Sequence, residues 1–285
     1  MGNKSISHYQ QEVYINGERL KGVQSCNASW SAPEGYVNAI GIKGGTVGTT
    51  VDDVMQAEFG VERFMIGPHD PMINLFESTN INGEIDYGEG GNFSFREACI
   101  NSYSCSCAVG ELVALNFGIT AYGRSGGVSP VSSKGDEVDD TVLIALPGSI
   151  IVDVDGQETN AVQSFDFQIN LTRNPVVLTG SNAPQDYIIE YPIQVDCQFS
   201  LIVEDYKSSD MLDFICAPKS QNLILRFTDC ASGDDIRRFF IPNAKVVDYN
   251  QSSAVGDRLS ATFTYKSLIR DISDLKKITE GTAFS

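Results

Sequence analysis

The chain lacks the segments that carry proteins into or across membranes. No apolar run in its 285 residues approaches the roughly 18 residues that a membrane-spanning helix needs. Residues 1–14 also lack the apolar stretch of a secretory signal peptide. We therefore expect synthesis in a cytoplasm, a polar N-terminal arm and no membrane segment.

Basic residues are scarce. The chain has 20 Lys and Arg against 37 Asp and Glu, and its formal net charge is −17. A protein that grips nucleic-acid phosphates needs basic stripes, so this balance argues against such a binder. The balance fits a soluble surface, or a surface that repels an anionic neighbour.

Metal ligands are few, since the chain has two histidines and none of its seven cysteines forms a Cys-x-x-Cys pair. The sequence therefore predicts neither a zinc site nor a cofactor. Cys26 and Cys197 fall among the apolar positions of predicted strands, so we expect them in the core. Free thiols are favoured in a cytoplasm, and disulfides formed later between subunits stay open as an alternative. The candidates for such bonds are Cys99, Cys105, Cys107, Cys216 and Cys230.

Groups that could carry catalysis are isolated. The stretch IKGGTVGTT at 42–50 has the glycines of a phosphate-binding loop but not its Gly-Lys-Thr ending, so we interpret residues 40–60 as a flexible loop. His69 stands beside Asp70, but neighbours in an extended chain point to opposite sides, and a turn between two prolines is favoured. Acidic pairs such as Asp52-Asp53 lie in loop-like stretches, where solvated turns are expected. We expect no enzyme.

What the sequence does contain is a repeat. NGERLKGVQS at residues 16–25 returns as DGQETNAVQS at residues 155–164, 139 positions later (155 − 16). Asn-Gly and Asp-Gly favour the tight turns that join antiparallel strands. After each turn, apolar and polar residues alternate in the same register through residues 26–32 and 165–171, as in half-buried strands.

A second match lies near the end of each half, where YSCSCAVGE at 103–111 parallels YNQSSAVGD at 249–257, 146 positions later (249 − 103). A weaker middle match sets Pro71 and Tyr87 near Pro192 and Tyr206. Ordered matches with unequal spacing predict a duplicated domain with different loops.

The predicted differences between the halves lie in the loops. The long 40–60 loop of the first half is matched only by a short link at 180–185. The second half alone has a predicted short helix, at 208–218.

The predicted fold is mainly β, with two tandem antiparallel β-sandwiches or partly open barrels and little helix. Residues 1–125 would form the first domain, with its N-terminal arm and the 40–60 loop. Residues 126–140 would form a linker, and 141–285 the second domain with a C-terminal arm.

The sequence resembles the bacteriophage tail tube family. Three sets of residues carry the resemblance: the hairpin motif at 16–25 and 155–164, the segment RFMIGPHDPMINLF at 63–76, and the AVGE or AVGD element with its strand at 108–121 and 254–267. The resemblance implies three subunits, each with two copies of the domain, in a pseudo-sixfold ring around a channel. Stacked rings would form a tube in the virion tail, assembled in the host cytoplasm, through which genomic DNA passes without specific binding. Sheath, tail terminator and baseplate proteins would be further partners.

An acidic channel would let DNA slide without sticking, because like charges suppress phosphate binding. The acids on polar faces of predicted strands are therefore the candidates for lining it: Glu84, Asp86, Asp166, Asp196 and Glu204. Two alternatives stay open, a tail-tip or baseplate hub protein with the same fold and a carbohydrate-binding adhesin. The single tryptophan, Trp30, falls in the apolar register, which argues against the clustered exposed aromatics of an adhesin.

Overall fold

The protein is mainly β. A computed structural model of the chain describes residues 12–31, 34–38, 46–51, 56–66, 70–87, 91–122, 125–126, 149–178, 184–202, 220–228, 235–252 and 259–280. All strand pairings in this part are antiparallel, and two short helical segments accompany them, η2 (Pro71–Leu75) and α2 (Ser273–Glu280). The predicted fold class is confirmed. No helix of the described part combines the length and apolar character needed to cross a membrane.

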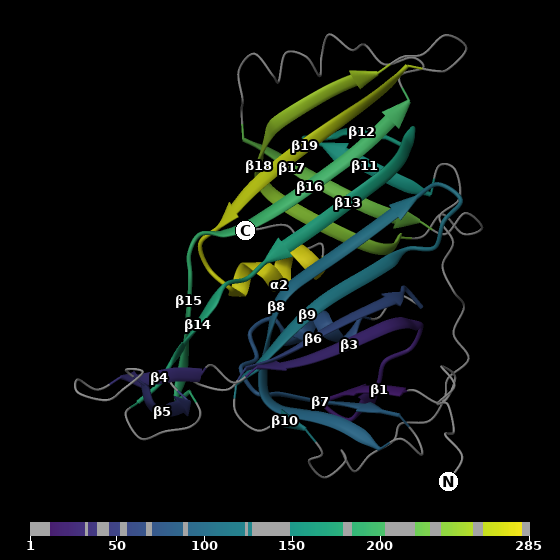
Figure 1. The fold of residues 1–285 in the computed structure, drawn as a ribbon. Coiled ribbons are helices and arrows are strands. Elements are labelled where there is room, and N and C mark those ends of the chain that lie inside the picture. Colours follow the sequence, from purple (N-terminus) through teal and green to yellow (C-terminus); the bar gives the residue numbers. More distant parts are fainter. Residues whose placement is uncertain are drawn as a thin grey trace.

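The strands fall into two sets along the chain (Figure 1). The first set is β1 (Glu12–Ile15), β2 (Glu18–Arg19), β3 (Val23–Ser31), β4 (Glu34–Asn38), β5 (Thr46–Val51), β6 (Gln56–Phe64), β7 (Ile81–Asp86), β8 (Asn92–Ala108), β9 (Ala114–Tyr122) and β10 (Ser125–Gly126). The second set is β11 (Ile150–Val154), β12 (Gln157–Thr159), β13 (Val162–Asn170), β14 (Arg173–Val176), β15 (Asp186–Ile189), β16 (Ile193–Ile202), β17 (Gln221–Thr228), β18 (Asp235–Ser252) and β19 (Ser260–Ile269).

The two sets repeat the same pairings. In the first, β1 pairs with β2 and β7, β7 with β8, β8 with β9, β9 with β6, and β6 with β3. The second set repeats every one of these pairings with strands whose labels are higher by ten. The register repeats as well, since Tyr103 lies opposite Phe117 and Tyr249 opposite Phe263. We call residues at the same register position of the two halves counterparts.

The hairpin motif forms the same turn twice. Asn16 and Gly17 have φ values of 49° and 87°, and Asp155 and Gly156 have values of 50° and 88°. Positive φ at both central residues is the geometry for which Asn-Gly and Asp-Gly are selected. The first side chain of each turn also accepts a hydrogen bond from a backbone N–H 2.8 Å away, that of Asn82 or of Asn222. The match at the hairpins is thus confirmed, and so is the match near the ends through residues 103–106 and 249–252; residues 253–257 of that match lie outside the described residues.

Each half is a two-layered sandwich, and one layer is continuous through the whole chain. The order of this central sheet is β3-β6-β9-β8-β13-β16-β19-β18 (Figure 1). The long strands β8 and β18 each bend out of it and continue into the second layer beside β7 and β17. Glu97 and Asn243, which are counterparts, carry positive φ values of 56° and 51° near the bends.

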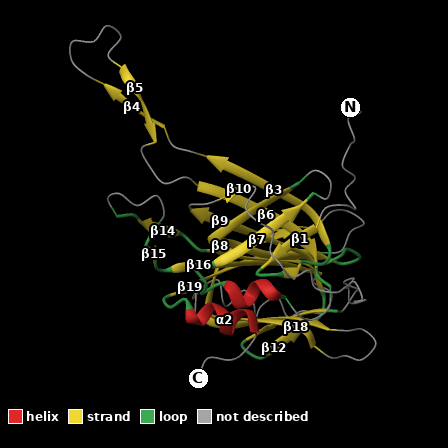
Figure 2. Ribbon diagram, turned by 90° about the horizontal axis from the view of Figure 1, so that it is seen from below, coloured by secondary structure: helices red, strands yellow, loops and turns green. Residues whose placement is uncertain are grey.

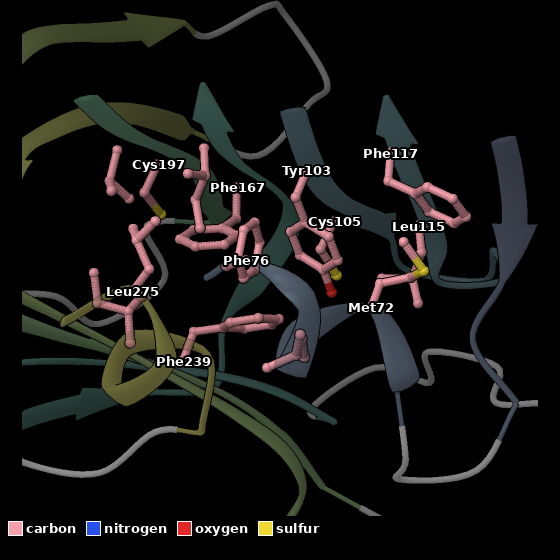
Figure 3. Packing of buried hydrophobic residues seen from close by; sticks show 14 of the residues in the cluster. Met72, Phe76, Tyr103, Cys105, Leu115, Phe117, Phe167, Cys197, Phe239 and Leu275 are labelled. Carbon is pink, nitrogen blue, oxygen red and sulfur yellow. The ribbon is translucent and has the colours of Figure 1, made fainter. Parts of the chain in front are cut away.

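A single apolar core joins the halves (Figure 3). Phe76 of the first half packs edge-on against Tyr103, with ring centroids 5.6 Å apart. Phe167 and Phe239 of the second half stack at 4.7 Å, and Leu275 of α2 is buried in the same cluster. Because the sheet and the core are both continuous, the halves are packed as one body. The domain boundaries at 125 and 141 stay a prediction.

The predicted contrast between a 40–60 loop and a short 180–185 link is wrong. Residues 46–51 form β5, which pairs with β4, and residues 56–60 open β6. The second half has a hairpin at the same place, β14 with β15, between β13 and β16. The β-branched residues of TVGTTV favour a strand, but the glycines around them hide the alternation that marks one.

Two other expectations are corrected. The middle match is wrong, because Pro192 stands before β16, the counterpart of β6, whereas Pro71 follows β6. The predicted C-terminal arm contains α2, whose start is capped by the Asp271 carboxylate 2.9 Å from the Ser273 N–H and whose Leu275 faces the core. The predicted helix at 208–218 and linker residues 127–140 lie outside the described residues.

Candidate assembly surface

The seam between the halves is a strand pair. Strand β8 lies antiparallel to β13 from Ala108 opposite Ser164 to Ser102 opposite Asn170. Ile169 and Tyr103 face each other across the seam on the core side, and both are fully buried. The seam therefore joins two copies of the domain through backbone hydrogen bonds and a shared apolar layer.

The strands equivalent to this seam are open at the two ends of the sheet. β3 is the counterpart of β13, and within the described residues it pairs with β6 alone. Residues 245–252 of β18 correspond to the seam part of β8, and in the described part they pair with β19 alone. Each end strand thus presents unpaired backbone groups, a surface that readily accepts another strand.

Trp30 marks the open edge of β3. It lies on the core-facing side of the strand, as the alternation predicts, yet its side chain is 55% exposed. Its counterpart in the seam, Ile169, is 0% exposed. Within the described residues, this large apolar side chain therefore lies exposed at the edge of the sheet. Carrying over the register of the internal seam would set Trp30 opposite Tyr249 of a neighbouring copy.

The other face of the central sheet is polar. Across β3, β8, β13 and β16 it presents mainly Ser, Asn and Gln side chains. Its charged residues within the strands are Glu58, Glu62, Asp166, Asp196, Asp248, Lys245 and Lys266. Five of these residues are acids and two are lysines, and Lys266 pairs with Asp196 at 3.5 Å. Acids therefore predominate over most of the face. Partial burial raises the pKa of Asp166.

The predicted channel acids divide between the layers. Asp166 and Asp196 lie on the polar face of the central sheet. Glu84 and Asp86 belong to β7 in the second layer, where Glu84 is buried and accepts a hydrogen bond from Asn92 at 3.0 Å. Glu204 lies outside the described residues. Alternation indicates which side of a strand is polar, but not which of two stacked sheets contains the strand, and the role of all five acids in a channel stays a prediction.

The cysteines proposed for bonds between subunits are enclosed where the structure describes them. Cys99, Cys105 and Cys107 are buried free thiols, and burial raises the pKa of Cys107 to about 12. Cys216 and Cys230 lie outside the described residues. A disulfide between chains through the three buried thiols would require local opening, and this pairing stays a prediction.

Asp70 serves the local structure. Its carboxylate caps η2 by accepting the Met72 N–H at 3.0 Å, accepts the Tyr103 hydroxyl at 2.9 Å and pairs with buried Arg63. These contacts tie the segment after β6 to the central sheet. His69 lies outside the described residues, so nothing is known of its position relative to Asp70.

No family model matches the chain, and no curated protein matches it. A search of solved structures finds similarity to Hcp1 from Flavobacterium johnsoniae, with 13% sequence identity. The match covers 42% of this chain and 93% of that chain, with a TM-score of 0.26. A likeness of this degree supports no conclusion about the function of this chain.

Proposed function

We propose that this protein is a structural subunit of a bacteriophage tail tube, with three copies in each ring and rings stacked around a channel. One observation carries the proposal: the two open edges of the central sheet correspond to the two strands already joined in the internal seam. β18 of one copy would pair with β3 of the next as β8 pairs with β13 within the chain.

Head-to-tail pairing of this kind is heterologous, because two different surfaces meet. Such contacts close into a ring when the rotation between units fits, and a closed ring leaves no open strand edge. Each chain already contains one junction of this kind in its internal seam, and the junction between chains would repeat it. The number of three chains comes from the family resemblance, in which six domains complete a ring.

In such a ring the polar face of the central sheet would line the channel. Asp166 and Asp196 would then face the DNA during ejection, and like charge would prevent tight binding to phosphate. The net charge of −17 supports this role. Contacts with sheath, terminator and baseplate proteins, and residence in the virion tail after assembly in the host cytoplasm, belong to the same proposal.

The experiment is assembly of the purified chain, followed by sedimentation, electron microscopy and tryptophan fluorescence. Trp30 is the only tryptophan, so its emission should shift to shorter wavelength when the edge of β3 is covered. We expect tubes from the wild type and folded monomers from Trp30→Glu, which places a charge in the new seam. Asn170→Glu adds the same charge on the polar face of β13 and should leave assembly intact.

Each alternative has its own outcome. Discrete single rings without tubes would favour a tail-tip or baseplate hub. Glycan binding by a wild type that stays monomeric at every concentration would favour an adhesin and overturn the proposal. Assembly of Trp30→Glu to the same extent as the wild type would show that the β3 edge is not the junction.

A further inference from the structure

A groove of about 1150 Å³ opens on β18 and β19 beside α2. Three apolar side chains line it and are unusually exposed: Tyr191 at 48%, Val247 at 52% and Leu268 at 60%. Its charged residues are three basic ones, Lys245, Lys266 and Arg270, and one acid, Asp274. An apolar surface of this kind with a basic rim is suited to a partner that carries acidic residues.

The same surface in the first half is covered by the chain itself. The counterparts of Asn243, Val247 and Leu268 are Glu97, Asn101 and Tyr122. The Leu171 N–H donates to the Asn101 carbonyl at 2.8 Å, and the Tyr187 hydroxyl donates to the Glu97 carbonyl at 3.1 Å. The ring of Tyr187 also packs on Tyr122 at 5.8 Å.

The covering segment in the first half is the β14–β15 hairpin, which leaves the second half at the end of β13 and returns at β16 (Figure 1). The counterpart of this hairpin is β4–β5, which leaves β3 and returns at β6. The strand registers match Glu34 with Arg173 and Thr49 with Tyr187. Figure 2 shows β4–β5 projecting away from the body of its own chain. Within the described residues, the repeat therefore contains one hairpin placed on a neighbouring domain and one that projects from the body of the chain.

The charges on the two sides change together. In the first half, the Arg173 guanidinium donates hydrogen bonds to the Phe76 and Ser78 carbonyls, and its charge opposes the rise in the Cys99 pKa that burial causes. The counterpart of Cys99 is Lys245, which stands directly opposite Lys266. Two like charges across a strand pair are unfavourable, and because Lys266 already pairs with Asp196, an acid from a partner would chiefly offset the charge of Lys245. At the position of Arg173 the first-half hairpin has Glu34, the opposite charge.

We propose that the groove between β18 and β19 is the docking site for the β4–β5 hairpin of a second copy of this chain, with Glu34 beside Lys245. The inference rests on the proposed ring and names the partner of its open surface. Strand pairing of β18 with β3 of the next copy would bring that hairpin over the groove, as pairing of β8 with β13 brings β14–β15 over the first half.

Charge reversal tests the contact between Glu34 and Lys245. Every copy carries both residues, so a single variant changes one side of every contact in the assembly. Glu34→Lys and Lys245→Glu should each raise the concentration needed for assembly by about tenfold or more, since each sets like charges against one another. The double variant should return it close to the wild-type value. Arg238→Glu makes the same charge change on β18 in the second layer and should have little effect. Equal assembly of both single variants and the wild type, or a double variant as defective as the singles, would overturn the inference.

A cross-linking experiment separates this inference from the proposed ring. Chains with Thr49→Cys are mixed with chains with Leu268→Cys under mild oxidation, and dimers are sought on non-reducing gels. Mixing Thr49→Cys with Gln198→Cys, on the polar face, is the control and should give none. A Thr49–Leu268 cross-link supports the docking, and it does so even if microscopy shows no rings. Rings without this cross-link would overturn the docking and leave the tube proposal standing, whereas neither rings nor cross-link would overturn both.

Discussion

The two halves of this protein present equivalent surfaces, one covered by another part of the chain and one open. In the first half, the seam part of β8 is paired with β13, and the residues of β8 and β9 just beyond the seam, Glu97 and Tyr122, lie under Tyr187 of the β14–β15 hairpin. In the second, the equivalent edge of β18 is open and the groove beside it exposes Val247 and Leu268. Because the strand registers agree, the covered half serves as a template for what would cover the open one.

The internal seam and the open edge should respond differently to the same change. Ile169→Glu buries an unpaired charge between β8 and β13, and should lower the free energy of unfolding by about 3–5 kcal/mol or prevent folding. Trp30→Glu, at the counterpart position, should change the stability of the isolated chain by less than about 1 kcal/mol. Urea unfolding followed by circular dichroism measures both. Equal losses in the two variants would contradict the view that the β3 edge is open.

The buried pair of Arg63 and Asp70 exists in the first half only, because the counterpart of Arg63 is Leu201. Asp70→Ala should cost about 3–5 kcal/mol, since it leaves a buried guanidinium without its partner. The double variant Arg63→Leu with Asp70→Asn copies the apolar solution of the second half and should recover much of the loss. Thermal and urea unfolding of the three variants provide the test, and a double variant no better than Asp70→Ala would refute the explanation.

The two hairpin turns should be equally sensitive. Gly17→Ala and Gly156→Ala each force a side chain into a positive φ, and each should cost about 1–2 kcal/mol. Urea unfolding gives the loss of stability in each variant, and the two losses are compared with each other. A loss in one and none in the other would show that the turns are not equivalent.

The β14–β15 hairpin that covers part of the first half should contribute measurably to the free energy of unfolding. Tyr187→Phe keeps the ring against Tyr122 but removes the hydrogen bond to the Glu97 carbonyl, which should cost about 1 kcal/mol. Thr49→Ala, at the counterpart position, should leave the unfolding of the monomer unchanged. Hydrogen exchange of the residues around Glu97 would locate the effect, and an unchanged exchange rate in Tyr187→Phe would argue against the cover.

The smallest effect concerns Asp166, whose counterpart is Asn27. Partial burial raises the pKa of Asp166 in the folded state, so ionisation favours the unfolded chain at neutral pH. Asp166→Asn should therefore stabilise the protein by roughly a few tenths of a kcal/mol at pH 7, a small gain because solvent screens a surface group. The gain should shrink as the pH falls through the raised pKa and vanish below the ordinary pKa of an aspartate, where Asp166 is protonated in both states. A destabilised variant at pH 7 would contradict this sign.

Much of the fold can be predicted from local patterns. Turn dipeptides such as Asn16-Gly17 act within a few residues, and alternation through Phe165 and Phe167 reports which side of a strand is buried. The ordering of such patterns along the chain is enough to show the duplication. For Asp166 and Asp196, the same alternation indicated the polar side of each strand, and the structure shows that both strands belong to the central sheet.

Other features could not be read in this way, because they depend on contacts between distant segments. Alternation around Glu84 gave no sign that β7 belongs to the second layer, and the pattern of Trp30 gave no sign that its strand ends the sheet. The hairpin β4–β5 was missed since glycines interrupt its alternation, and α2 was missed in a short C-terminal segment.

The amino-acid sequence by itself thus determined the turns, the strands and the presence of two copies, because each follows from backbone preferences and burial patterns over short distances. Only the tertiary structure decided that β8 joins β13 while β3 and β18 stay open. Strand edges acquire neighbours through long-range pairing, and the same local sequence is compatible with a paired or an unpaired edge. The difference between Ile169 and Trp30 therefore lies in their surroundings and not in the pattern that both share.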